Sequence, residues 1–241
     1  MADYIDKNIL CQAYVHVELP EGMTENQLEE IKSQLSTFAT LRGKFFVYDD
    51  VIVDVEFKEG SLKAYITIAG AIYIAIGQYG SFRSGVDFIY TDVKRLAESI
   101  VAECLFMTRA RHEAIRRTEA RTGVIGSLKI LVDDMNQLEG SVGEISVEEA
   151  ARRVKKIKDD ADQLLINVRS DEDAAEIQNE LDDFSTNLPD RWPHPPENRP
   201  DPLAIVSYYD AISDLRKSYG KKKTGSPKMP VRKIVDIKPE G

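Results

Sequence analysis

The sequence contains few of the residues from which compact catalytic or disulfide-linked sites are built. It has 2 cysteines, 3 histidines and 1 tryptophan in 241 residues. Two cysteines cannot form a disulfide scaffold or a four-ligand zinc site, and they fit a reducing, cytoplasmic compartment. The N-terminus MADYIDKN has neither a basic region nor an apolar run, so we expect no secretory signal. No established catalytic motif occurs, and we expect no cofactor and no metal.

The charges are divided unevenly along the chain. The formal net charge is −9 and the isoelectric point about 5.0, which argues against a general nucleic-acid-binding protein. Residues 122–200 carry nine basic and eighteen acidic side chains, whereas residues 220–241 carry seven basic and two acidic ones. The sequence therefore predicts a flexible basic tail attached to an acidic body. A hydrophobic fraction of 42% is enough for most of the chain to fold.

The first third of the chain has the pattern of a small α+β module. Apolar and polar residues alternate over residues 10–19, which predicts a half-buried strand. Thr24 and Gln27 then form a capping box before an amphipathic helix that we expect to end near Gly43. Two further alternating segments flank a short turn containing Gly60 and predict a β-hairpin. We therefore expect a small antiparallel sheet with one packed helix, within a module spanning residues 1–85.

From Ser84 onwards the apolar spacing becomes helical. Val86, Ile89, Val93 and later residues follow at intervals of three and four, and we expect this helix to continue through Arg109–Arg121. Short connections between the helices that follow predict a bundle with coiled-coil-like packing. The expected parts of this half are a bundle over 86–188, a proline-rich linker over 189–202, a terminal helix over 203–219 and the tail over 220–241.

The terminal helix has two specific predicted features. Asp201 and Pro202 suit its N-cap and first turn. Its apolar residues Val206, Tyr209, Ile212 and Tyr219 are expected to point inward.

The stretch from Ala64 to Phe82 contains nineteen residues and no charge. That length could span a bilayer, but its isoleucines alternate as in a strand and three glycines interrupt it. We favour a buried or oligomer-facing segment, and membrane insertion stays open as the alternative. The interaction candidates in it are Ile72, Ile74, Ile76, Gly77 and Tyr79.

Arginines supply the remaining candidates. Arg83 follows the glycine-rich turn GQYGS and precedes a helix, where it either anchors the turn or contacts an anion. Five arginines lie within residues 109–121. On a helix, Arg109, Arg116 and Arg117 could share one side and contact phosphate. The alternative, which we favour, pairs them with the acidic helices of residues 122–188.

Several segments of the first half carry a resemblance to a known family. They are CQAYVHVEL, VIVDVEFKEGSLKAYITIAG and GQYGSFRSGVDFIY, within about residues 8–110. These segments resemble adaptor-type modules of bacterial antiviral defence systems, which are likened to the N-terminal domain of the TRADD signalling adaptor. The resemblance implies an interaction domain that couples sensing to an effector, sometimes beside a membrane-associated segment. It implies no catalytic residues.

Together these features favour a non-enzymatic adaptor or assembly subunit that acts through a protein partner or a homo-oligomer. One alternative is a membrane-perturbing effector that uses residues 64–82 and would be membrane-associated. A second alternative is an enzyme with a non-standard site near the GSFRSG turn.

Overall fold

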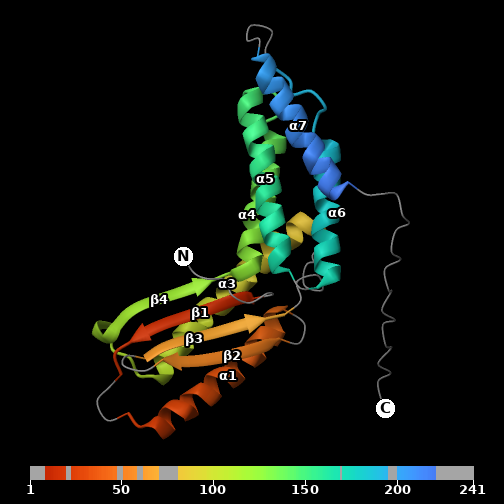
Figure 1. Ribbon diagram of the computed structural model, residues 1–241. Coiled ribbons are helices and arrows are strands. Elements are labelled where there is room, and N and C mark those ends of the chain that lie inside the picture. The colour runs from red at the N-terminus through yellow and green to blue at the C-terminus, as the bar shows by residue number, and fades with distance from the viewer. Residues whose placement is uncertain are drawn as a thin grey trace, which may run out of the picture.

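The computed structural model has a sheet unit from which a bundle of helices extends (Figure 1). The structure describes residues 9–19, 23–47, 51–58, 62–70, 81–168, 170–194 and 200–220. The predicted α+β fold, with a small antiparallel sheet and a helical C-terminal half, is confirmed. The predicted basic tail lies outside the described residues from position 221 onwards.

The sheet unit follows the order strand, helix, strand, strand, helix, strand. Its elements are β1 (Ile9–Val17), α1 (Glu25–Val47), β2 (Ile52–Lys58), β3 (Leu62–Ala69), α3 (Phe82–Met107) and β4 (Ile115–Arg121). The strand order is β2-β3-β1-β4, and all three neighbouring pairs are antiparallel. This connectivity is the ferredoxin-like, split βαβ arrangement. β2 and β3 form the predicted hairpin.

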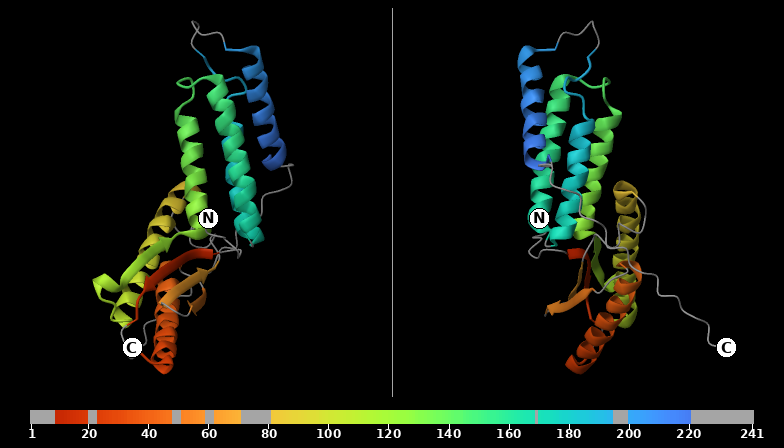
Figure 2. Two further views of the ribbon diagram at one scale, coloured as in Figure 1. Left: turned by 60° about the vertical axis from the view of Figure 1, so that its left-hand side comes forward. Right: turned by 90° about the vertical axis from the view of Figure 1, so that its right-hand side faces the viewer.

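One face of the sheet forms the core of this unit. Because side chains alternate between the faces of a strand, every second residue of β1 and β3 points to the same side. These residues are fully or almost fully buried: Cys11, Ala13, Val15, Val17, Leu62, Ala64, Ile66 and Ile68. Two helices, α1 and α3, cover this face, where the sequence predicts one (Figure 2).

Helix α1 begins as predicted but continues beyond Gly43. The Gln27 amide nitrogen donates to Thr24 Oγ1 at 3.4 Å, and the Thr24 amide donates to Gln27 Oε1 at 2.9 Å, which completes the capping box. The predicted end at Gly43 is wrong, because the helix continues to Val47. A Cβ added at Gly43 would lie 2.7 Å from Val51 Cγ2. Gly43 therefore allows α1 to pack closely against the chain leading into β2.

Helix α3 differs from the prediction at both ends. The helix begins at Phe82, ahead of the expected start at Ser84, and Ser81 is its N-cap residue, whose side chain accepts a hydrogen bond from the Ser84 amide. The helix ends at Met107, so the predicted continuation through Arg109–Arg121 is wrong. Arg109 has a φ of +50°, which turns the chain out of the helix. Residues 115–121 then form β4, which pairs with β1 and completes the sheet.

The bundle contains α4 (Gly123–Gly140), α5 (Val147–Asn167), α6 (Asp171–Asn187) and α7 (Pro202–Tyr219). Side chains cap three of these helices: Ser146 accepts from the Glu149 amide, Ser170 from the Asp173 amide and the predicted Asp201 from the Leu203 amide. The last helix, α7, packs on the outside against α5 and α6 (Figure 2).

The orientation of α7 and the proline-rich segment depart from the predictions. α7 buries Tyr208 and Leu215 together with the predicted Ile212 and Tyr219, whereas Val206 and Tyr209 are exposed.

Trp192 lies in the segment predicted to be a linker, yet its side chain is only 4% exposed. Its indole N–H donates to the Ile145 carbonyl at 2.9 Å, and Tyr208 Oη donates to the Pro189 carbonyl at 2.7 Å. Residues 189–192 are therefore fixed to the bundle.

The sheet unit and the bundle share one continuous hydrophobic core. Helix α3 contacts β1, β4 and α1 as well as α4, and thus belongs to both. Only Thr122 separates β4 from α4. Gly123 there has a φ of +47°, and an added Cβ would collide with the carbonyl oxygen of Ile9. The sheet extends to Arg121, so a division at residue 85 does not follow the strand pairing.

Candidate functional site: the open face of the sheet

The face of the sheet opposite α1 and α3 carries a regular array of polar and aromatic side chains, which we call the open face. None of the described helices packs over its centre (Figure 2). The strand register places its residues in three rows. The first row is Arg121, Gln12, Thr67 and Asp54; the second is Glu119, Tyr14, Tyr65 and Glu56; the third is Arg117, His16 and Lys63.

Two tyrosines from the central strands form the middle of the open face. The ring centroids of Tyr14 and Tyr65 are 4.8 Å apart, with the rings tilted by 46°. The Arg121 guanidinium lies 5.6 Å from the centroid of the Tyr14 ring, on the other side of it from β3. Tyr14 is therefore buried, whereas Tyr65 is partly accessible. Burial, followed by the neighbouring Tyr65 hydroxyl, raises the pKa of Tyr14.

Hydrogen bonds across three strands fix three residues of the first row. Gln12 Nε2 donates to Thr67 Oγ1 at 3.0 Å, and Arg121 Nη1 donates to Gln12 Oε1 at 2.9 Å. Arg121 also forms an ion pair with Glu119. These contacts hold Arg121 over Tyr14 before any ligand arrives, which reduces the entropy lost on binding.

The third row gives one end of the open face a concentration of basic groups. Arg117, His16 and Lys63 are neighbours across β4, β1 and β3. Arg117 is 66% exposed and forms an ion pair with Glu119 on its own strand. Because two thirds of the Arg117 side chain is exposed, an incoming carboxylate can approach its guanidinium from solvent.

The predicted arginine stripe is wrong in its geometry. Arg116 and Arg117 lie on a strand instead of a helix. Arg116 points away from Arg117 and bonds Glu18, with its Nε 3.0 Å from Glu18 Oε1. The ion pairs formed by Arg116 and Arg117 thus stay within the sheet and do not reach the acidic helices. Arg109 lies on the exposed turn after α3 and forms no ion pair within the described part of the chain.

Arg83 connects three helices through its ion pairs. From the first turn of α3 it pairs with Glu139 of α4 and Glu180 of α6, and its Nη1 donates to Asn136 Oδ1 at 2.6 Å. The hydrogen bond to Glu139 raises the pKa of the guanidinium, with partial burial opposing it and Glu180 adding to it. Because carboxylates occupy its donors, Arg83 is placed to hold three helices together. Most of the glycine-rich turn that it is predicted to anchor lies outside the described residues.

The interaction candidates in the charge-free stretch lie outside the described residues. Ile72, Ile74, Ile76, Gly77 and Tyr79 all fall there. The beginning of the stretch, up to Ala69, belongs to β3, and Phe82 begins α3. Among the helices that the structure describes, none has the length and apolar character needed to cross a bilayer.

Nucleophiles and metal ligands do not converge in the described ranges. Cys11 and Cys104 are fully buried in the core, and this burial raises the pKa of each thiol to about 12. No group of three or more His, Cys, Asp or Glu side chains is arranged to hold a metal ion in those ranges. Neither cysteine lies on the open face.

Sequence reasoning singled out only one of these open-face residues, Arg117. Alternation over residues 10–19 does place Gln12, Tyr14 and His16 on the polar side of a strand. What the sequence did not reveal is that residues 115–121 form the neighbouring strand and bring Arg121 to Tyr14.

Comparison of the sequence with protein-family models and with curated proteins finds no match to either.

Proposed function

We propose that this protein is a non-enzymatic adaptor or assembly subunit that binds a protein partner through the open face. The observation that carries the proposal is the prearranged centre of that face, where Tyr65 is partly accessible beside the Tyr14–Arg121 pair. Tyrosine and arginine, with tryptophan, are the residue types most enriched at energetically important points of protein interfaces.

The charges of the face define the chemistry of the partner. Arg117 and Lys63 lie at one end, beside the tyrosines. A segment that places an apolar or aromatic group on Tyr65 and a carboxylate near Arg117 would match this arrangement. The resemblance of residues 8–110 to adaptor modules suggests a setting for such a partner, namely a bacterial antiviral defence system.

The test compares charge-reversal variants on and off the open face. A tagged chain is co-expressed with the products of the genes adjacent to its own, and any protein that co-purifies is titrated against it by calorimetry. Lys63→Glu combined with Arg117→Glu should weaken that binding by at least about tenfold, and Tyr65→Ala should weaken it as well.

Arg95→Glu is the matched control, because Arg95 is 68% exposed on α3, away from the open face. Equal binding by the control and by both open-face variants would refute the proposal. Retained binding by Arg95→Glu alone would support it.

A further inference from the structure

Helices α5 and α6 continue toward the sheet unit beyond the point where α7 ends, as Figure 1 and Figure 2 show. The last residue of α7 is Tyr219, whose hydroxyl donates to the carboxylate of Asp162 on α5. The residues of α5 and α6 that lie past this contact are 163–167 and 171–182. We call them the uncovered end, because α7 stops before it reaches them.

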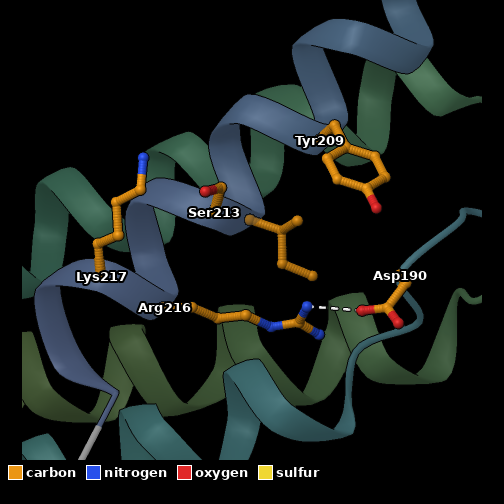
Figure 3. Close-up of a pocket in the computed structure, with 6 residues that line it drawn as sticks. Asp190, Tyr209, Ser213, Arg216 and Lys217 are labelled. Atoms are coloured by element: carbon orange, nitrogen blue, oxygen red, sulfur yellow. Dashed lines mark hydrogen bonds and ion pairs between the residues drawn. The ribbon is translucent and has the colours of Figure 1, made fainter. Parts of the chain in front are cut away.

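Hydrogen bonds fix the position of the last turns of α7 on α6. Arg216 Nε donates to the Ser185 carbonyl at 3.0 Å, and its Nη2 donates to the Leu188 carbonyl at 3.0 Å. The third nitrogen, Nη1, donates to Asp190 Oδ1 at 2.6 Å, which is the contact drawn in Figure 3. The place at which α7 stops is therefore well defined.

Helix α7 points along the uncovered end. Arg216 lies at Ser185 of α6, whereas Gly220 lies at Asp182, since an added Cβ at Gly220 would be 3.8 Å from Asp182 Oδ1. The two helices thus run in opposite directions, and the same course continues past Asp182 toward Asp171, the first residue of α6. Asp182 and Asp171 are eleven residues apart, or about 17 Å along the helix, which about five residues of chain can span. The chain continues for 21 residues after Gly220.

An apolar side chain is exposed at the uncovered end. Ile166, in the last turn of α5, is 59% exposed. Because it follows Asp162 by four residues, it lies on the side of α5 to which Tyr219 is bonded. Helix α7 ends one turn too early to cover Ile166. Residues 221–241 contain apolar side chains of their own, among them Met229.

The uncovered end also carries acidic side chains without a cation. Asp171 and Asp182 lie on one side of α6, because eleven residues are close to three full turns. Neither carboxylate forms an ion pair within the described ranges. Helix α6 as a whole contains seven acidic residues and no basic one. Three consecutive lysines, 221–223, follow Gly220, and residues 221–241 carry seven basic and two acidic side chains.

We infer that residues 221–241 bind back onto the uncovered end of the same chain. Lys221, Lys222 and Lys223 pair with the carboxylates of Asp182 and Asp171, and an apolar residue farther along the chain covers Ile166. Exposed ion pairs are individually weak and are screened by salt, so this contact is reversible. The inference goes beyond the proposed function, because it concerns a different surface and needs no partner protein.

The first test measures the reactivity of a cysteine at the uncovered end. Ile166→Cys in the full chain is reacted with N-ethylmaleimide, which is uncharged, while both native thiols are buried. Replacing Lys221, Lys222 and Lys223 together by glutamine should raise the reaction rate at least about twofold, because the covering segment is released. Raising the salt concentration to about 0.5 M should have the same effect.

Ile130→Cys is the matched control, because Ile130 is 58% exposed on α4 and lies outside the uncovered end. Its reaction rate should not respond to the lysine replacements. An unchanged rate for Ile166→Cys, or an equal increase for Ile130→Cys, would overturn the inference.

The second test identifies the carboxylates that hold the segment. A fluorophore attached to Met229→Cys reports through its anisotropy whether the segment is bound. Asp171→Asn combined with Asp182→Asn should lower the anisotropy to its value at high salt. Glu144→Gln combined with Glu148→Gln removes the same two charges at the opposite, exposed end of α5 and should leave the anisotropy unchanged.

Equal anisotropy in the two double variants would overturn the inference. An anisotropy that rises with protein concentration would overturn it as well, because the segment would then bind a second copy. Neither test depends on the open face or on its partner.

Discussion

Gly123 shows how much one backbone position contributes to joining the two parts of the chain. Its φ of +47° is strained for any residue with a side chain, and an added methyl group would collide with the backbone of β1. Gly123→Ala should therefore lower the free energy of unfolding by at least about 2 kcal/mol. Urea denaturation followed by circular dichroism measures this change.

Gly140→Ala is the control for Gly123→Ala, because a Cβ at Gly140 meets no atom within 4 Å. Gly140 ends α4, so alanine there should be neutral or slightly stabilising. Similar losses in the two variants would contradict the explanation based on the contact with β1.

Tyr208 should make stability depend on alkaline pH. Burial raises the pKa of its hydroxyl to about 12, an effect that Arg216 partly opposes, from an unfolded value near 10.0. Between pH 10 and 12 the unfolded chain releases this proton while the folded chain keeps it. Stability should then fall by up to about 1.4 kcal/mol per pH unit from this group.

Tyr208→Phe tests this titration. It removes the hydrogen bond to the Pro189 carbonyl and should lower the free energy of unfolding by about 1 kcal/mol at neutral pH. It should also make the loss of stability above pH 10 less steep than in the wild type. An unchanged slope would mean that other groups, such as Tyr219, dominate the alkaline titration.

At the level of elements, residues 189–192 connect α7 to the rest of the bundle through side-chain contacts. Trp192 packs edge-on against Tyr208, with ring centroids 5.5 Å apart, and bonds the carbonyl of Ile145. Trp192→Ala should lower the free energy of unfolding by about 3 kcal/mol. Trp192→Phe should lower it less, because the phenyl ring fills part of the space. Thermal unfolding followed by circular dichroism measures both. Arg191→Ala, at the exposed neighbouring position, should change the free energy of unfolding little. A comparable loss in Arg191→Ala would indicate that any substitution in residues 189–192 destabilises the protein.

Elements with strong local signals could be predicted from sequence, and β4 could not. Ser146, Ser170 and Asp201 identify helix starts because capping is a local interaction. Residues 115–121 contain only Ile115 and Ala120 as apolar residues, so neither helical nor strand periodicity is clear. Pairing with β1, about a hundred residues earlier, determines their conformation. The open face was inaccessible to sequence reasoning for the same reason.

The faces of α7 illustrate a second limit. Both possible apolar stripes are present in its sequence, and only the shape of α5 and α6 selects the one containing Tyr208 and Leu215. A hydrophobic pattern identifies residues that can be buried, but it does not identify the neighbour that buries them.

At the scale of the whole molecule, the shared core predicts a single cooperative unfolding transition. Ile66 is fully buried in the sheet, and Trp192, the only tryptophan of the chain, lies in the bundle. Ile66→Ala should therefore lower the urea midpoint reported by Trp192 fluorescence, because the free energy of unfolding falls by about 3 kcal/mol. An unshifted fluorescence transition, with an early partial change in circular dichroism, would show that the sheet unit and the bundle unfold separately.

The unbroken course of α3 also has a consequence for how a bound partner is oriented. Over 26 residues this helix extends for about 39 Å and contacts both the sheet and α4, while a single residue connects β4 to α4. A partner held on the open face would therefore keep one direction relative to the bundle, because no long linker separates the sheet unit from α4. Rigidity would thus set the angle at which the partner is presented.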